Sequence, residues 1–330
     1  MPADRQAGRT VFFFLSSSPN DCIGGCMHHN FTQQDLYVFI DILVFHQAPD
    51  TRVGSLPDER NFEIRIRGNN TALENSADIP LSPGDYIIAP KFSSVTLCVS
   101  DELYLDRVLS HSVTPRDSAF RDKIRHRDRG CVLSGVINKA ADRGNWKAFE
   151  AAHIWPLSKG TEWVRQNAGC WITDSDGLSN EDKMNSPQNG ILLSSNSHML
   201  FNSHTLAVNP EVEVSPFFVA QYDTADYRVY AFDDDNFGYS GKYMSLPARQ
   251  NGESGARDTL LQWHFRQSVL ANMRGAGEPI WDYGPNEEGD VVGRLLSSDH
   301  TMTRLGEEVG ARLALTSYLP SSSSSFRDSQ

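Results

Sequence analysis

The chain has 330 residues, of which 39% are hydrophobic and 22% charged, so it is long enough for two domains and too apolar for a disordered chain. Its 30 Lys and Arg against 42 Asp and Glu give a formal net charge of −12. Taken over the whole chain, this charge argues against a polyanionic partner, because proteins that bind nucleic acid neutralise phosphates with Lys and Arg.

The first hundred residues have the pattern of β-strands. Residues 61–68 alternate apolar and charged side chains, the period of two expected of a half-buried strand. Residues 36–45 and 86–97 are further apolar runs rich in β-forming residues, with turn residues between the runs. We therefore predict a β-rich N-terminal domain over residues 1–112, to which the sequence assigns no role.

The one apolar run near the start, Val11 to Leu15, is too short for a signal-peptide core or a membrane span. This predicts a soluble, intracellular protein, nuclear or cytoplasmic, without membrane association. The five cysteines are thinly spread and indicate no disulfide framework. Cys22 and Cys26 precede His28 and His29, which leaves two interpretations: half of a zinc site without its second half, or ordinary loop residues.

A second module is predicted over residues 113–276. It begins with a short basic helix over 118–125, in which Phe120 and Ile124 share one face. Downstream, the pattern predicts two strands and two helices: 205–208, 227–232, 195–202 and 258–273. Residues 277–330 are acidic and rich in Ser, which is typical of a flexible tail.

Charge is distributed unevenly along the chain. Residues 111–165 carry 11 Lys and Arg against 6 Asp and Glu, whereas residues 1–110 carry 8 against 14 and residues 166–270 carry 6 against 13. The basic segment is therefore the candidate for contact with phosphates, and the alternative is a solvated helix face. The candidate phosphate-binding side chains are Arg121, Lys123, Arg125, Arg127 and Lys159.

Three polar residues downstream stand at spacings that suggest a single site. His153 follows an apolar turn, Asn189 comes 36 positions later, and His198 a further nine. In the helix expected over 195–202, His198 and Asn202 lie four residues apart and project from the same face. Paired donors of this kind suit a metal ion.

Four short motifs contain these residues: Cys-Val-Leu-Ser-Gly at 131–135, Glu-Ala-Ala-His-Ile-Trp-Pro at 150–156, Asn-Gly-Ile-Leu-Leu at 189–193 and His-Met-Leu-Phe-Asn at 198–202. In this order and spacing they resemble a branch of the HNH endonucleases, of the kind found in uncharacterised fungal proteins. The resemblance covers about residues 115–275, half of the chain.

The resemblance implies an α+β chain in which the β-rich N-terminal domain precedes a ββα-metal nuclease domain. It places His153 as the general base and Asn189 as the central asparagine, which in this family either binds the metal or orients the loop of the base. It places His198, with Asn202 or Asn189, around one divalent ion (Mg²⁺, Mn²⁺ or Zn²⁺). The implied activity is hydrolysis of phosphodiester bonds in nucleic acid, with DNA favoured over RNA.

One position departs from the family pattern. Many members have Asp or His immediately before the base as a metal ligand, and this chain has Ala152. Glu150 is the nearest acid, but in an extended strand it faces the opposite side from His153, so we interpret it as a structural or supporting residue. The alternative function is a degenerate module that binds nucleic acid or protein without turnover. The sequence leaves the oligomeric state open.

Three further expectations concern the interior of this module. Of Trp146, Trp155, Trp163 and Trp171, we expect at least two in the core, although such rings also stack on bases. Cys131 is expected to be a buried structural thiol. His204, just past the helix, is expected at the surface.

Overall fold

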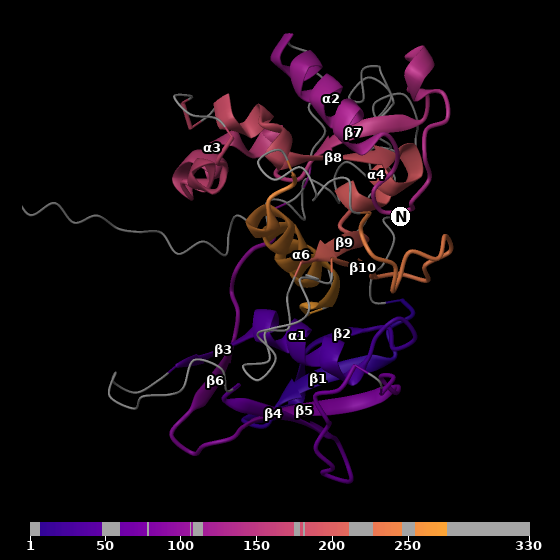
Figure 1. The fold of residues 1–330 in the computed structure, drawn as a ribbon. Helices are drawn as coiled ribbons and strands as arrows, with labels where there is room; N and C mark the ends of the chain where they lie inside the picture. The colour runs from indigo at the N-terminus through magenta and orange to yellow at the C-terminus, as the bar shows by residue number, and fades with distance from the viewer. Residues whose placement is uncertain are drawn as a thin grey trace, which may run out of the picture. The chain divides into compact units, whose positions relative to one another are not determined.

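The polypeptide is an α+β chain in which a sheet-rich N-terminal region precedes a module of hairpin and helices, and this confirms the expected fold class (Figure 1). The computed structural model describes residues 7–47, 60–77, 79–105, 107, 115–174, 179–180, 182–210, 227–245 and 255–275. All of them belong to one compact unit, Asp4–Ile280. The expected domain boundary near residue 112 and the predicted tail at 277–330 lie outside the described residues.

The N-terminal region is built on a four-stranded mixed sheet. The strands lie in the order β2-β1-β5-β4, with bounds Ser18–Cys26, Val11–Leu15, Gly84–Pro90 and Phe62–Ile66. β1 runs parallel to β5 and antiparallel to β2, and β4 is antiparallel to β5. The alternation predicted over 61–68 is confirmed in β4, where Phe62 and Ile64 are buried.

The strand expected over residues 36–45 is wrong for most of its length. Helix α1 occupies Gln33–Leu43, and only then does β3 (Val44–Gln47) begin, paired with β6 (Thr96–Val99). Thr32 and Asp35 form a capping box, in which the Asp35 carboxylate accepts from the Thr32 backbone N–H at 2.8 Å. The buried apolar residues recur at helical rather than strand spacing: Leu36, Phe39, Ile40 and Leu43.

The second module contains a β-hairpin with a helix on each side. Strands β7 (Phe149–His153) and β8 (Gly190–Ser194) are antiparallel, with His153 opposite Gly190, and α4 (Ser195–Asn202) follows directly. The connection between the strands contains α3 and four 3₁₀ helices, with bounds Gly160–Arg165, Leu157–Lys159, Ala168–Trp171, Asp182–Asn185 and Pro187–Asn189. The hairpin and the helix that the resemblance implies are therefore both present.

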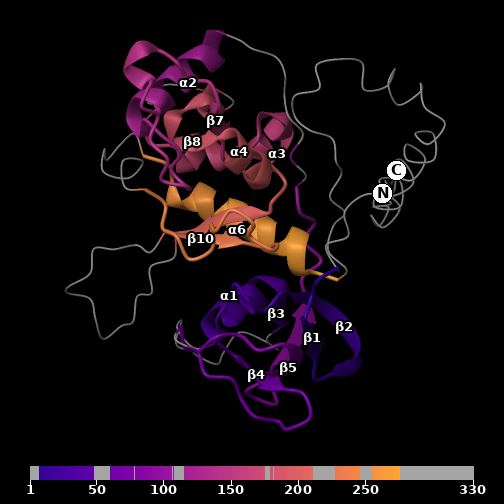
Figure 2. The same cartoon turned by 90° about the vertical axis from the view of Figure 1, so that its right-hand side faces the viewer.

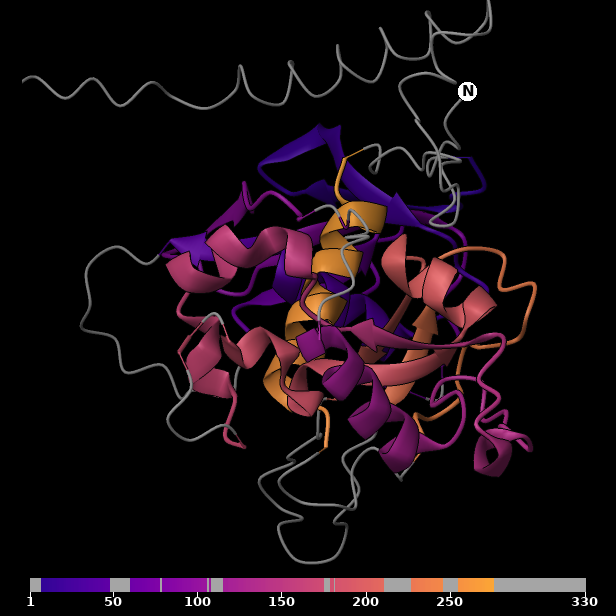
Figure 3. The same ribbon diagram turned by 90° about the horizontal axis from the view of Figure 1, so that it is seen from above.

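Helix α2 covers one face of this hairpin. It spans Pro115–Asp128, and its Phe120 and Ile124 pack with Leu192 of β8, as the predicted shared face requires. A 3₁₀ turn at Ala141–Arg143 lies in the connection from α2 to β7. Figure 3 shows α2 and the hairpin at the same end of the module.

Helix α6 joins the two regions. It spans Asp258–Met273, as predicted, and packs against β9 (Leu206–Asn209), which pairs with β10 (Arg228–Ala231). It also packs against α1 and β2, so the N-terminal region shares its hydrophobic core with a helix of the second module (Figure 2). Among the described helices, none is both long and apolar enough to cross a bilayer.

Candidate active site

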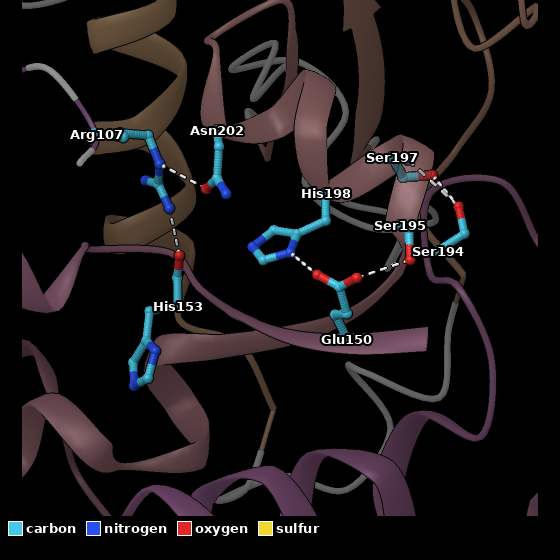
Figure 4. A network of polar contacts seen from close by, with 8 residues as sticks. All are labelled: Arg107, Glu150, His153, Ser194, Ser195, Ser197, His198 and Asn202. Atoms are coloured by element: carbon cyan, nitrogen blue, oxygen red, sulfur yellow. Dashed lines mark hydrogen bonds and ion pairs between the residues drawn. The ribbon is translucent and has the colours of Figure 1, made fainter. Parts of the chain in front are cut away.

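A carboxylate and an imidazole meet between the hairpin and α4. Alternation along β7 turns Glu150 toward α4, where its Oε2 lies 2.6 Å from Nδ1 of His198 (Figure 4). Its Oε1 accepts a hydrogen bond from the Ser195 hydroxyl at 2.7 Å. With Nδ1–H donated to the carboxylate, the neutral His198 ring presents its Nε2 lone pair, which makes no hydrogen bond among the described residues.

The start of α4 fixes this geometry. Ser194 is the N-cap and accepts from the backbone N–H of Ser197 at 3.3 Å, so His198 falls in the second turn facing β7. The His198 side chain is 14% exposed and that of Glu150 is 39% exposed, so solvent reaches both groups. The hydrogen bond from His198 lowers the pKa of Glu150, against the effect of partial burial. Glu150 is therefore a carboxylate at neutral pH.

Asn189 is buried, and both atoms of its amide bond to the backbone. Oδ1 accepts from the N–H of Trp155 at 2.8 Å, and Nδ2 donates to the carbonyls of Trp155 at 3.2 Å and Met184 at 2.9 Å. These bonds fasten the loop that follows His153. Of the two roles that the resemblance left open for Asn189, this geometry fits orientation of the loop.

His153 ends β7 with its ring on the α2 side. The imidazole stacks on Phe120 with ring centroids 3.9 Å apart and planes 6° from parallel, and its Nε2 lies 3.0 Å from Oδ1 of Asn185. Figure 4 shows this ring pointing away from His198. The structure therefore brings the backbone of His153, but not its ring, beside the pair formed by Glu150 and His198.

Arg107 completes the cluster and was missed by the sequence analysis. Its Nε donates to Oδ1 of Asn202 at 3.2 Å, and its Nη2 donates to the carbonyl of His153 at 2.5 Å. Its guanidinium also lies over the ring of Phe201, 5.0 Å from the centroid. No local signal marks Arg107, because it stands in the acidic N-terminal third, outside every motif.

Few of the described side chains at this site can bind a metal ion. Among the described residues there is no group of three or more His, Cys, Asp and Glu side chains that could hold a metal ion. Within this cluster the donor left for a metal ion is Nε2 of His198, because Glu150 holds the other nitrogen of the same ring and also accepts from Ser195. Near the N-terminus, Cys22 is exposed whereas Cys26 is buried.

Four of the five basic residues expected to contact phosphates reach the surface to different extents. Lys123 is exposed, the Arg121 side chain is 42% exposed, and Lys159 is half-buried. The Arg125 guanidinium lies over Trp146, 5.2 Å from its centroid, and burial together with neighbouring Arg121 lowers its pKa.

Arg127 is placed differently from the other four. It is buried in an ion pair with Asp128 at 2.6 Å, and it donates to the carbonyls of Pro187 at 2.9 Å and Gly190 at 2.7 Å. Arg127 follows Phe120 and Ile124 at helical spacing on the buried face of α2, where it holds the start of β8. Its position does not fit contact with a phosphate, and we leave it out of the proposed surface.

Two expectations for the interior are confirmed and one is wrong. Trp155 and Trp163 are fully buried, and Cys131 is buried with its Sγ 3.2 Å from the Ser197 hydroxyl. His204 is 2% exposed rather than at the surface. Its left-handed backbone, φ 60°, turns the chain back under α6, where its Nδ1 lies 3.0 Å from the Ser268 hydroxyl.

Comparison with known proteins bears on this hairpin, its loop and α4. Residues 131–209 match the model of the HNH endonuclease family. The chain carries an HNH endonuclease domain. The match covers about a quarter of the chain and includes His153, Asn189, His198 and Asn202 but not Arg107. The same comparisons find no curated protein and no solved structure that matches the chain.

Proposed function

We propose that the chain is a metal-dependent endonuclease that hydrolyses phosphodiester bonds in nucleic acid, with DNA as the preferred substrate. The observation that carries the proposal is the pairing of Glu150 and His198 across the hairpin and helix of the HNH domain, at 2.6 Å. A carboxylate that holds one ring nitrogen leaves the other as a fixed lone pair, the usual arrangement of a metal-bound histidine.

His198 is the residue that would hold the divalent ion (Mg²⁺, Mn²⁺ or Zn²⁺) through Nε2, and Glu150 would fix the orientation of its ring through Nδ1. When bound, such an ion neutralises the charge that develops on the phosphate oxygens. Asn189 is a positioning residue for the loop after β7. The Oδ1 of Asn202 already accepts from Arg107, so Asn202 binds a metal only if that hydrogen bond is exchanged.

His153 is the proposed general base. A histidine titrates near neutrality, so its neutral form can take a proton from the attacking water. It stands at the end of β7, whose Glu150 contacts His198. The ring lies on the opposite face of β7 from Glu150, so this role requires the end of β7 to rearrange until the ring leaves Phe120 and approaches His198.

The proposed nucleic-acid surface lies on α2 and the connections on either side of β7. Arg121, Lys123, Arg125 and Lys159 contribute to it. Four further exposed cations among the described residues precede β7 in the same basic segment: Lys139, Arg143, Lys147 and Arg129, the last of which pairs with Asp142. Contacts of this kind neutralise phosphates without reading the base sequence.

Plasmid cleavage in Mg²⁺ and in Mn²⁺, with an EDTA control, tests the proposal. We expect His153→Ala to lower the cleavage rate by about 10²–10⁴ while leaving Mn²⁺ binding by calorimetry unchanged. His198→Ala should lose both cleavage and Mn²⁺ binding. His126→Ala, at an exposed histidine of α2, is the matched control and should behave as wild type. Wild-type cleavage by His153→Ala would exclude it as the base.

A second candidate is a module that binds nucleic acid without cleaving it. The observation that favours it is the orientation of His153, whose ring faces Phe120 and Asn185 rather than His198. Duplex DNA bound by the protein and left intact in every metal would favour this second function.

A further inference from the structure

Arg107 contacts three residues of the candidate site, although it lies outside the matched residues 131–209. Each nitrogen of its guanidinium makes one hydrogen bond: Nε to Asn202 at 3.2 Å, Nη2 to the carbonyl of His153 at 2.5 Å, and Nη1 to the carbonyl of Ile154. It therefore contacts both α4 and the end of β7 (Figure 4).

The hydrogen-bond partners of Arg107 among the described residues are all neutral groups. Its acceptors are two backbone carbonyls and an amide oxygen, and among the described residues no carboxylate pairs with it. Burial lowers its pKa to about 9, so it remains a cation at neutral pH. Two other inward-facing arginines have carboxylate partners: Arg127 pairs with Asp128, and Arg228 with Asp35 at 2.8 Å. Buried Arg9 instead donates to the carbonyls of Asn272 and Gly275.

The segment before Arg107 is fixed on α6. The backbone N–H of Leu105 donates to Oε1 of Gln267 at 2.6 Å, and its carbonyl lies 3.2 Å from Nε2 of His204. Glu102 accepts from the Arg266 guanidinium at 2.5 Å and 2.8 Å. The cation is therefore held in place before any ligand arrives, which lowers the entropy cost of binding one.

We propose that Arg107 binds an oxygen of the phosphodiester at this site. A guanidinium has five N–H donors, and the three described bonds leave two for an anion. Their fork geometry matches two oxygens of one phosphate, and the neutral surroundings leave its charge for the ligand. The proposal rests on the proposed function for the identity of the anion. The alternative is that Arg107 has a purely structural role and only holds α4 and β7 together.

The test uses bis(p-nitrophenyl) phosphate, a small diester that reports on the site without long contacts to α2. Its dissociation constant is measured by calorimetry in EDTA for wild type, R107Q, R107K and R165Q, with the melting temperature of each. We expect R107Q to weaken binding about 10-fold to 100-fold, the usual effect of losing a charge-assisted hydrogen bond. R107K keeps the charge but loses the fork, so its binding should weaken several-fold. R165Q, at an exposed cation of α3 outside the proposed nucleic-acid surface, should bind as wild type.

Several outcomes overturn the proposal: no diester binding by wild type, or a folded R107Q that binds as wild type does. If R107Q does not fold, R107K decides, and an unchanged dissociation constant then overturns the proposal.

Plasmid cleavage in Mn²⁺ separates this inference from the proposed function. Wild type that binds the diester through Arg107 but cleaves no plasmid refutes the nuclease and keeps the anion site. Equal cleavage by wild type and R107Q refutes a role for Arg107 and keeps the nuclease.

Discussion

At the scale of single residues, Glu150 supplies the carboxylate that Ala152 does not. The family pattern leads one to look for a ligand immediately before His153, and Ala152 supplies none. Glu150, two positions earlier on the same face of β7, brings a carboxylate to His198 instead. The site thus contains a carboxylate although the position immediately before His153 lacks one. Glu150 contacts His198 directly, whereas its place in the strand had suggested a supporting role only.

Asn189 allows a test at this scale. We expect Asn189→Ala to lower the free energy of unfolding by about 2–4 kcal/mol, because two or three buried backbone groups lose their partner at about 1–3 kcal/mol each. Urea denaturation measures the change, and Asn196→Ala, at an exposed position of α4, is the matched control. If Asn189→Ala keeps wild-type stability but loses Mn²⁺ binding, Asn189 is a metal ligand rather than a positioning residue.

At the scale of elements, α4 and α6 meet through stacked rings. His264 of α6 is fully buried and lies flat on Phe201 of α4, with centroids 3.7 Å apart, and its Nε2 is 3.1 Å from the Phe201 carbonyl. The Arg107 guanidinium also lies over the ring of Phe201, 5.0 Å from its centroid. Because α6 also contacts α1 and β2, this stack connects the candidate site with the shared core.

The stack predicts a pH dependence of stability. Burial, followed by the charge of Arg107, holds the pKa of His264 well below 6.5. As pH falls below about 6.5, the unfolded chain takes up a proton that the folded protein refuses, so stability decreases toward acid. The contribution of this residue reaches about 1.4 kcal/mol per pH unit.

The measurement is urea denaturation between pH 7 and pH 5. His264→Phe keeps the stack but removes the titrating group, so its stability should fall less steeply than that of wild type. His126→Ala, at an exposed histidine, should keep the wild-type slope. Equal slopes for wild type and His264→Phe would show that His264 is protonated in the folded state.

At the scale of the whole molecule, the N-terminal region and the second module are joined by polar as well as apolar contacts. Asp35 of α1 is buried, pairs with Arg228 of β10 at 2.8 Å and accepts from the Tyr230 hydroxyl at 2.8 Å. Phe265 and Val269 of α6 lie in the N-terminal core cluster. The two regions should therefore unfold together, even though the sequence predicts separate domains at 1–112 and 113–276.

Asp35→Asn tests this coupling. Removing one partner of a buried ion pair leaves the other uncompensated, so we expect a loss of about 3–5 kcal/mol in a single unfolding transition. Asp41→Asn is the control on the same helix: its exposed pair with Arg60 should be worth about 0–1 kcal/mol. Calorimetry that resolves two transitions in wild type, with only one shifted by Asp35→Asn, would show independent domains.

The net charge of the whole molecule hides an uneven distribution of charge along the chain. The value of −12 is an average over acidic segments and one basic segment, residues 111–165, which leads into β7. Most of that segment is α2 and the connections around β7, and most of its cations are exposed. A nuclease with this distribution contacts phosphates at a few places and is sensitive to salt there.

The sequence by itself determined the elements whose signals are local. The alternation in β4, the shared face of Phe120 and Ile124 in α2, and the extents of α4 and α6 follow from periodicity within each segment. The four motifs were sufficient to indicate the HNH domain. The strand expected over 36–45 failed because the capping box before α1 outweighed the β-propensity of its apolar residues.

Only the tertiary structure decided which of these residues meet. Glu150 and His198 are 48 positions apart, and Arg107 and Asn202 are 95 apart, so no local pattern records either contact. The same holds for Arg127, which the charge pattern put on the surface and which hydrogen bonds to the carbonyls of Pro187 and Gly190, 60 and 63 positions away, hold inside. The periodicity of a segment determines on which face of its own helix or strand a side chain lies. Tertiary packing determines which residues that face contacts, and the candidate site depends on those contacts.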